Sequence, residues 1–139
     1  MKKSYIKSII LILLHATGLV LLMSFKFEKL RVWKIAMELS DEIHTTALTF
    51  PDYEKFSLCN QIKKAADSVV LNIAEGCTLQ TDKEFKRFLV IANRSVNEVV
   101  ACLYLSIRRK YIDKPRFNTL YDGYLNLVRQ IQSFIKSLE

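Results

Sequence analysis

Glycine and proline are scarce in this chain of 139 residues, which contains three glycines and two prolines. Few residues therefore interrupt the backbone, which argues against many short strands joined by tight turns and favours long helices with short connections. The length allows one ordinary domain core but not two. Half of the residues are apolar and a quarter are charged. This composition is typical of a folded globular chain and excludes wholesale disorder.

Residue patterns that bind metal ions are also missing. The only histidines are His15 and His44, and Asp41, three residues before His44, is not matched by a second such pair. A di-metal site in a helical bundle needs paired Glu-x-x-His sequences on facing helices, so none is expected. The cysteines are Cys59, Cys77 and Cys102. Their odd number and the lack of a C-x-x-C pair predict free thiols in a reducing compartment and no zinc site.

Sequence signatures of catalysis are likewise absent. The chain has no glycine-rich phosphate loop, no G-x-S-x-G sequence and no Cys-His pair with a third group to orient it. We therefore expect a non-enzymatic protein without a cofactor or a small-molecule substrate. Lysine and arginine, 21 in all, outnumber the 14 aspartates and glutamates. Such an excess suits a polyanion or an acidic protein partner.

Residues 1–26 form an apolar leader that we expect to lie outside the fold. Basic residues at 2–7 precede an apolar run at 9–23. This run is shorter than the roughly 20 residues that span a bilayer, and no small-x-small cleavage site follows it. Three interpretations remain: an over-extended start with the true start at Met23, a signal peptide that is removed, or a membrane anchor through residues 5–23. We prefer the first, which implies a cytoplasmic protein.

Four later segments carry apolar residues at alternating spacings of three and four, the period of an amphipathic helix. They run from about 28 to 48, 54 to 75, 81 to 110, and from Pro115 to 138. Pro51 is expected to end the first helix, and Gly76 the second as a C-terminal glycine. Thr81 and Glu84 have the spacing of a capping box at the start of the third. Residues 27–139 are therefore predicted to form an all-α, antiparallel up-down-up-down four-helix bundle.

Six short segments resemble a known family. They are FEKLRVW at 27–33, FP at 50–51, EKFSL at 54–58, QIKKAADSV at 61–69, NIAEG at 72–76 and EFKRFL at 84–89. In this order they resemble the bacterial four-helix bundle proteins encoded in intervening sequences of the 23S ribosomal RNA gene, a likeness that covers residues 27–138. Two departures are that Lys63 and Lys64 stand where that family usually has arginines, and Arg94-Ser95 where it has Gly-Ser.

The resemblance implies more about assembly than about chemistry. It implies a closed ring of protomers, a homopentamer. It also implies similarity to the accessory protein of diversity-generating retroelements, a basic bundle that binds nucleic acid and a reverse transcriptase. The candidate partners are therefore further copies of the chain, RNA or DNA, and a reverse transcriptase or another protein.

A basic ridge on the third predicted helix is the sharpest candidate site. Its members are spaced by four, seven and fourteen residues, which places them on one solvent side opposite the apolar stripe. They are Lys83, Arg87, Arg94 and Arg108, and Lys63, Lys64, Lys114 and Arg116 could extend the ridge. Since no helix-turn-helix or zinc finger is visible, nucleic-acid contact would be led by phosphates. The alternative is a solvated helix face, with residues 108–110 complementing the helix C-terminus.

Two further groups have mainly structural interpretations. Asn72 and Glu75 are expected to hydrogen-bond to loop backbone or to a neighbouring helix, with Gly76 supplying the turn. Tyr104, Val100 and Tyr121 lie outside the apolar stripes and predict a second buried surface, either between copies of the chain or against a protein partner. Two functions thus remain: a homo-oligomeric bundle that binds RNA or DNA, and an assembly or protein-binding module without nucleic-acid contact.

Overall fold

The computed structural model describes residues 25–138, and within this range it contains four α-helices, two short 3-10 helices and no strand. In chain order these are η1 (Lys26–Lys29), α2 (Arg31–Ala47), η2 (Asp52–Glu54), α3 (Leu58–Cys77), α4 (Asp82–Arg108) and α5 (Lys114–Ser137). The predicted all-α class is confirmed. The apolar run at 9–23 and its three interpretations lie outside the described residues.

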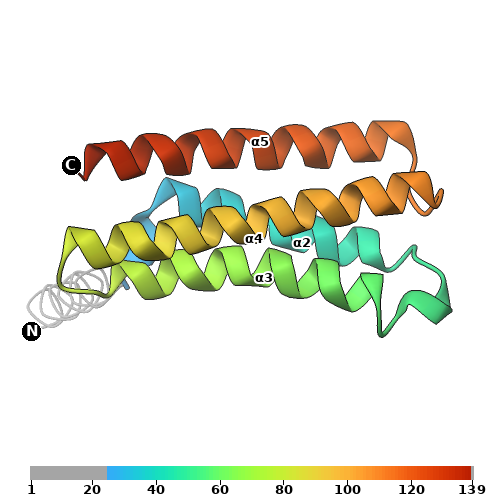
Figure 1. The fold of residues 1–139 in the computed structure, drawn as a ribbon, viewed down its shortest axis with the longest axis horizontal. Coiled ribbons are helices and arrows are strands. Elements are labelled where there is room, and N and C mark those ends of the chain that lie inside the picture. Colours follow the sequence, from blue (N-terminus) through green and yellow to red (C-terminus); the bar gives the residue numbers. More distant parts are fainter. Residues whose placement is uncertain (1–24, 139) are drawn as a thin grey trace, which may run out of the picture.

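The helices pack as a four-helix bundle. Following the chain in Figure 1, each of α3, α4 and α5 runs back along the helix before it, so consecutive helices are antiparallel. Each helix packs against two others: α3 lies between α2 and α4, and α5 closes the bundle against α4 and α2. The α3–α4 pair makes the most extensive contact. The predicted bundle is therefore confirmed.

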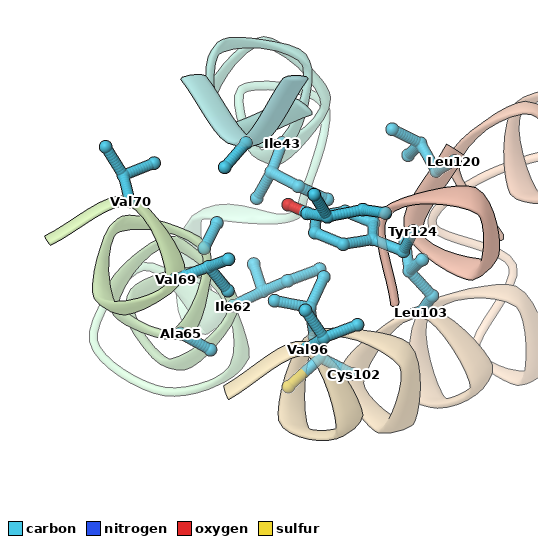
Figure 2. Close-up of a cluster of buried hydrophobic side chains, with 14 of the residues drawn as sticks. Ile43, Ile62, Ala65, Val69, Val70, Val96, Cys102, Leu103, Leu120 and Tyr124 are labelled. Carbon is cyan, nitrogen blue, oxygen red and sulfur yellow. The ribbon is translucent and has the colours of Figure 1, made fainter. Parts of the chain in front are cut away.

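The core is built from the apolar stripes that the sequence predicts. Figure 2 shows Ile43 of α2, Ile62 and Val69 of α3, Leu103 of α4 and Tyr124 of α5 converging between the four helices, and all five side chains are almost fully buried. Complete burial of one such aliphatic side chain contributes about 1.5–3 kcal/mol relative to exposure. Packing of these stripes, rather than local propensity, therefore holds the helices together.

Two helix starts are fixed by side chains. The hydroxyl of Thr81 accepts a hydrogen bond from the backbone N–H of Glu84 at 3.2 Å and donates one to the Glu84 carboxylate at 3.1 Å. This is one half of the predicted capping box, because the carboxylate binds the hydroxyl and not the Thr81 N–H. At α5, Asp113 accepts from the N–H of Arg116 at 2.8 Å, and Pro115 lies in the first turn, where its missing N–H costs nothing.

Gly76 does not end α3 as the sequence predicted. The helix continues to Cys77, and no glycine in residues 25–138 has a positive φ, so Gly76 supplies no left-handed turn. It is buried instead against α4: a Cβ at this position would lie 2.6 Å from Cβ of Phe88 and 2.9 Å from Cδ2 of Phe85. The glycine is therefore needed for the close approach of α3 and α4. Its contacts, Phe85 and Phe88, lie nine and twelve residues further along the chain.

The N-terminal part of the described chain begins slightly before the predicted bundle. Phe25 and Lys26 belong to the segment expected outside the fold, yet Lys26 begins η1 and the ring of Phe25 stacks on Phe27 with centroids 5.6 Å apart. Phe27 in turn contacts Trp33 at 4.9 Å. Residue 28 lies in η1, and the first α-helix starts three residues later than the periodicity indicated, at Arg31.

Among the described helices, α4 is long and apolar enough to cross a bilayer, judged by length and composition alone. This is weak support for a membrane span, since core helices pass the same test and α4 supplies Leu89, Val96 and Leu103 to the core.

The three cysteines are free thiols. Cys59 and Cys102 are buried, and burial, with the nearby Glu98 charge, raises the pKa of Cys102 to about 11.

Candidate nucleic-acid interface

The outer face of α4 brings three of the predicted basic residues together. Lys83, Arg87 and Arg94 are exposed on the side of the helix opposite the buried Leu89 and Val96. At 1.5 Å per residue they extend over roughly 16 Å of the helix. The guanidinium carbon of Arg87 lies 5.9 Å from the ring centre of the neighbouring Phe88. The three cations therefore form a row along the exposed side of α4.

The neighbouring helix α3 adds Lys64 to this row. Hydrogen bonds between the side chains of Gln61 and Glu98, and between the hydroxyls of Ser68 and Ser95 at 2.8 Å, fix the antiparallel register of α3 and α4. Lys64 lies between Gln61 and Ser68 and is exposed, which places it within about one turn of the level of Arg94. We call Lys64, Lys83, Arg87 and Arg94 the α3–α4 basic face.

Lys63 and Arg108 lie apart from this face. Lys63 is half-buried and lies four residues before Asp67, whose carboxylate bonds to α2, so it belongs to the α2 side of α3. Arg108 is exposed at the other end of α4, about 21 Å from Arg94 along the helix. The α4 surface between them carries neutral and acidic residues, among them Asn97, Glu98, Ala101 and Leu105. The predicted ridge is thus interrupted.

The two predicted extensions near α5 differ in their surroundings. Arg116 connects α5 to α2: its Nε donates to the Thr46 hydroxyl at 2.8 Å, and a terminal nitrogen donates to the Glu42 carbonyl at 3.0 Å and pairs with the Glu42 carboxylate. The Arg116 guanidinium is therefore engaged in contacts within the bundle. The ammonium of Lys114 lies 5.1 Å from the ring centre of Phe117, on the exposed start of α5.

Asn72, Glu75 and Gly76 do not form a shared polar site in the described structure. Asn72 donates to the carbonyl oxygen and hydroxyl of Ser68, at 2.8 and 3.0 Å, so it bonds within its own helix and supports the Ser68–Ser95 contact. Glu75 is exposed, and its carbonyl accepts from the Thr78 hydroxyl at 2.8 Å. Asn72 thus bonds within α3 and not to loop backbone or a neighbouring helix as expected, while Gly76 packs against α4.

The Arg94-Ser95 departure from the family pattern leaves the helix packing intact. Ser95 is buried and bonds to Ser68, whereas Arg94 is exposed. A long side chain at position 94 therefore adds a charge to the surface without entering the α3–α4 contact.

A buried glutamate is the main feature that sequence reasoning missed. Glu54 accepts hydrogen bonds from the Ser57 hydroxyl, from the N–H of Leu58 at 3.1 Å, from Tyr111 at 2.9 Å and from Arg109 at 3.1 Å. These hydrogen bonds, that of Ser57 first, hold the pKa of the carboxyl below its usual value of 4.5. Glu54 thereby binds the first N–H of α3, which begins at Leu58, four residues after η2 ends and later than predicted. It also joins the α2–α3 connection to the α4–α5 connection.

His44 connects α2 to α3. Its Nε2 lies 2.9 Å from Asp67 Oδ1, which also accepts from the Ser40 hydroxyl at 2.7 Å. Across residues 25–138 no group of three His, Cys, Asp or Glu side chains is placed to hold a metal ion.

A groove between α4 and α5 is lined by two of the three residues that the sequence analysis assigned to a second surface, Val100 and Tyr121. These two side chains and Val128 are half-buried, and the buried Tyr124 also lines the groove. Tyr104 is half exposed, with its ring 5.0 Å from Phe117 and 6.2 Å from Tyr121.

Comparison with known proteins identifies the family. A sequence model described as 23S rRNA-intervening sequence protein matches residues 28–133. The chain belongs to this family. A solved structure with 25% sequence identity, a protein of unknown function from the S23 ribosomal protein family of Bacteroides thetaiotaomicron VPI-5482, has the same fold with a TM-score of 0.71. The similarity covers 76% of this chain and 98% of that protein. No curated protein sequence matches the chain. The resemblance to intervening-sequence proteins is thereby confirmed.

Proposed function

We propose that this intervening-sequence family protein binds RNA or DNA, without catalysis, through the α3–α4 basic face. The observation that supports this function is the row formed by Lys64, Lys83, Arg87 and Arg94, because none of the four forms an ion pair within residues 25–138. Exposed cations without acidic partners attract phosphates through release of condensed counterions. Three exposed acids border this face: Glu98 bonds to Gln61, Glu84 accepts from the Thr81 hydroxyl, and Glu75 lies on the same side of α3 as Lys64.

Binding through this face would be weakly selective for sequence. Lysine and arginine side chains on an outer helix surface contact phosphates, which carry no sequence information. The cytoplasm, where RNA is accessible, is the proposed compartment.

Fluorescence anisotropy with a labelled RNA hairpin over a series of salt concentrations tests the proposal. The double variant Arg87→Ala with Arg94→Ala should weaken binding and reduce the slope of log affinity against log salt by about two, one for each lost phosphate contact. The matched control is Lys34→Ala with Arg129→Ala, which removes the same charge from exposed positions on α2 and α5. Equal losses in both double variants would mean that net charge alone is responsible, and no binding by the wild-type protein at low salt would eliminate the function.

The second candidate, an assembly module, is favoured by the α4–α5 groove. We propose that this groove joins identical protomers in a ring, the homopentamer implied by the family resemblance, with docking of a reverse transcriptase or another protein as the alternative occupant. Apolar groove walls formed by Val100, Tyr121 and Val128 suit a packed subunit contact.

Light scattering on the eluted protein measures the mass of the assembly directly. Val100→Glu should reduce it to that of smaller species, because a charge buried in the contact lacks a partner. The control Leu71→Glu places the same charge at an exposed position of α3. A monomeric wild-type protein would remove this candidate.

A further inference from the structure

One end of the bundle carries unusually exposed apolar side chains. The α2–α3 and α4–α5 connections meet there, at the right-hand end of Figure 1. Phe56 is 87% exposed, Leu48 84% and Tyr53 76%. Rings held in water contribute little to folding, and two aromatic rings three residues apart form a surface that is available to a ligand.

The Tyr53 ring is held in place by the fold. Its hydroxyl lies 3.1 Å from that of Tyr111, and the two rings meet edge to face with centroids 6.4 Å apart. Tyr111 is itself fixed, since its hydroxyl donates to the buried Glu54 carboxylate and its ring packs on Phe50 at 5.6 Å. A ring that is already ordered loses little conformational entropy when a ligand stacks on it.

The charge around these rings is positive. Segments 48–57 and 105–116 hold six lysines and arginines against three acids. Two of the acids already have partners: Glu54 pairs with Arg109, and Asp113 accepts a hydrogen bond from the first turn of α5. The exposed cations that remain are Lys55, Arg108, Lys110 and Lys114. The ammonium of Lys55 lies 5.7 Å from the centre of the Phe56 ring, so cation and ring are adjacent.

We propose that this end of the bundle binds unpaired bases of RNA, which stack on Phe56 and Tyr53 while the surrounding cations contact the flanking phosphates. Every base has a π face, but a double helix hides these faces within its own stack, so the combination selects loops and single strands. The positive charge fits this polyanion and repels a second, equally basic copy of the chain.

The inference rests on the proposed function, because the aromatic end would bind a second part of the same RNA. Helix α4 joins the two sites, because the α3–α4 basic face covers its first half and Arg108 lies at its end. The distance of about 21 Å between Arg94 and Arg108 allows a stem on the basic face to extend its loop to the aromatic end.

A comparison of two RNA probes tests the inference. The first is a blunt-ended duplex, and the second is the same stem closed by a loop of unpaired adenosines. The wild-type protein should bind the stem-loop about tenfold more tightly, and Phe56→Ala should remove this preference without changing affinity for the duplex. Because stacking is not ionic, the salt dependence should stay the same, and Phe56→Trp should keep the preference.

The matched control is Leu48→Ala, which shortens an equally exposed side chain that cannot stack, at the end of α2. Equal binding of both probes by the wild-type protein, with no effect of Phe56→Ala, would overturn the inference and leave the proposed function intact. A change in oligomeric mass caused by Phe56→Ala would also overturn it, since the ring would then pack against another protomer. If neither RNA binds the wild-type protein, the proposed function and this inference both fail.

Discussion

The contact between Gly76 and α4 predicts how sensitive the bundle is to a single methyl group. A Cβ at this position would lie 2.6 Å from Cβ of Phe88 and 2.9 Å from Cδ2 of Phe85. Nonbonded carbon atoms normally approach to about 3.5–4.0 Å, so Gly76→Ala requires α3 and α4 to separate locally by about 1 Å. Rotation of the Phe88 side chain gives no relief, because its Cβ is attached directly to the backbone.

Two opposing effects set the size of the change. Overpacking at a close contact costs about 1–3 kcal/mol, whereas alanine in a helix interior is about 1 kcal/mol more favourable than glycine. We therefore expect Gly76→Ala to lower the free energy of unfolding by up to about 2 kcal/mol. The control Gly123→Ala gains the same helix propensity, but its Cβ meets only Cδ2 of Leu39, at 2.6 Å. That methyl group ends a flexible side chain and can rotate away.

Urea unfolding followed by far-UV circular dichroism measures both variants. Gly76→Ala should unfold at a lower urea concentration than the wild-type protein, and Gly123→Ala at the same or a higher one, with unchanged m-values. Combining Gly76→Ala with Phe85→Leu should restore only part of the loss, since the contact with Phe88 remains. If Gly76→Ala proves as stable as Gly123→Ala, then α3 and α4 do not pack as tightly as this reasoning requires.

Three other predictions concern single side chains. The lowered pKa of Glu54 stabilises the fold above about pH 4.5, and this stability is lost as the pH falls further. Glu54→Gln should therefore flatten the acid limb of stability against pH, and an unchanged limb would assign acid unfolding to other groups. The Tyr124 hydroxyl is buried without a hydrogen-bond partner in residues 25–138, and burial raises its pKa. Tyr124→Phe should leave the free energy of unfolding unchanged or raise it by up to about 1 kcal/mol, and a clear loss in urea titration would reveal a bound partner. Lys110 has a φ of 61° at the end of α4, where glycine is favoured. Lys110→Gly should raise the thermal midpoint, with a stabilisation of about 0.5–1 kcal/mol, and a lower midpoint would show that the lysine side chain itself contributes.

Local sequence was sufficient to predict the helices and their buried faces. Alternation of apolar residues at three and four positions specifies which side of a helix avoids water, and this holds whichever partner covers it. Ile62, Leu103 and Tyr124 lie on the apolar stripes of the predicted helices and are buried in the core for this reason. The start of α4 was also predictable, because Thr81 and Glu84 bond to each other within one turn.

Tertiary structure decided the features that depend on residues distant in the chain. The partners of Glu54 include Arg109 and Tyr111, more than fifty residues away, and no spacing rule links them. The register of α3 against α4 divides the predicted basic residues, bringing Lys64 to the level of Arg94 and leaving Arg108 at the aromatic end. Helical periodicity determines the face on which a side chain lies, whereas only the packing of the helices determines its neighbours across that face.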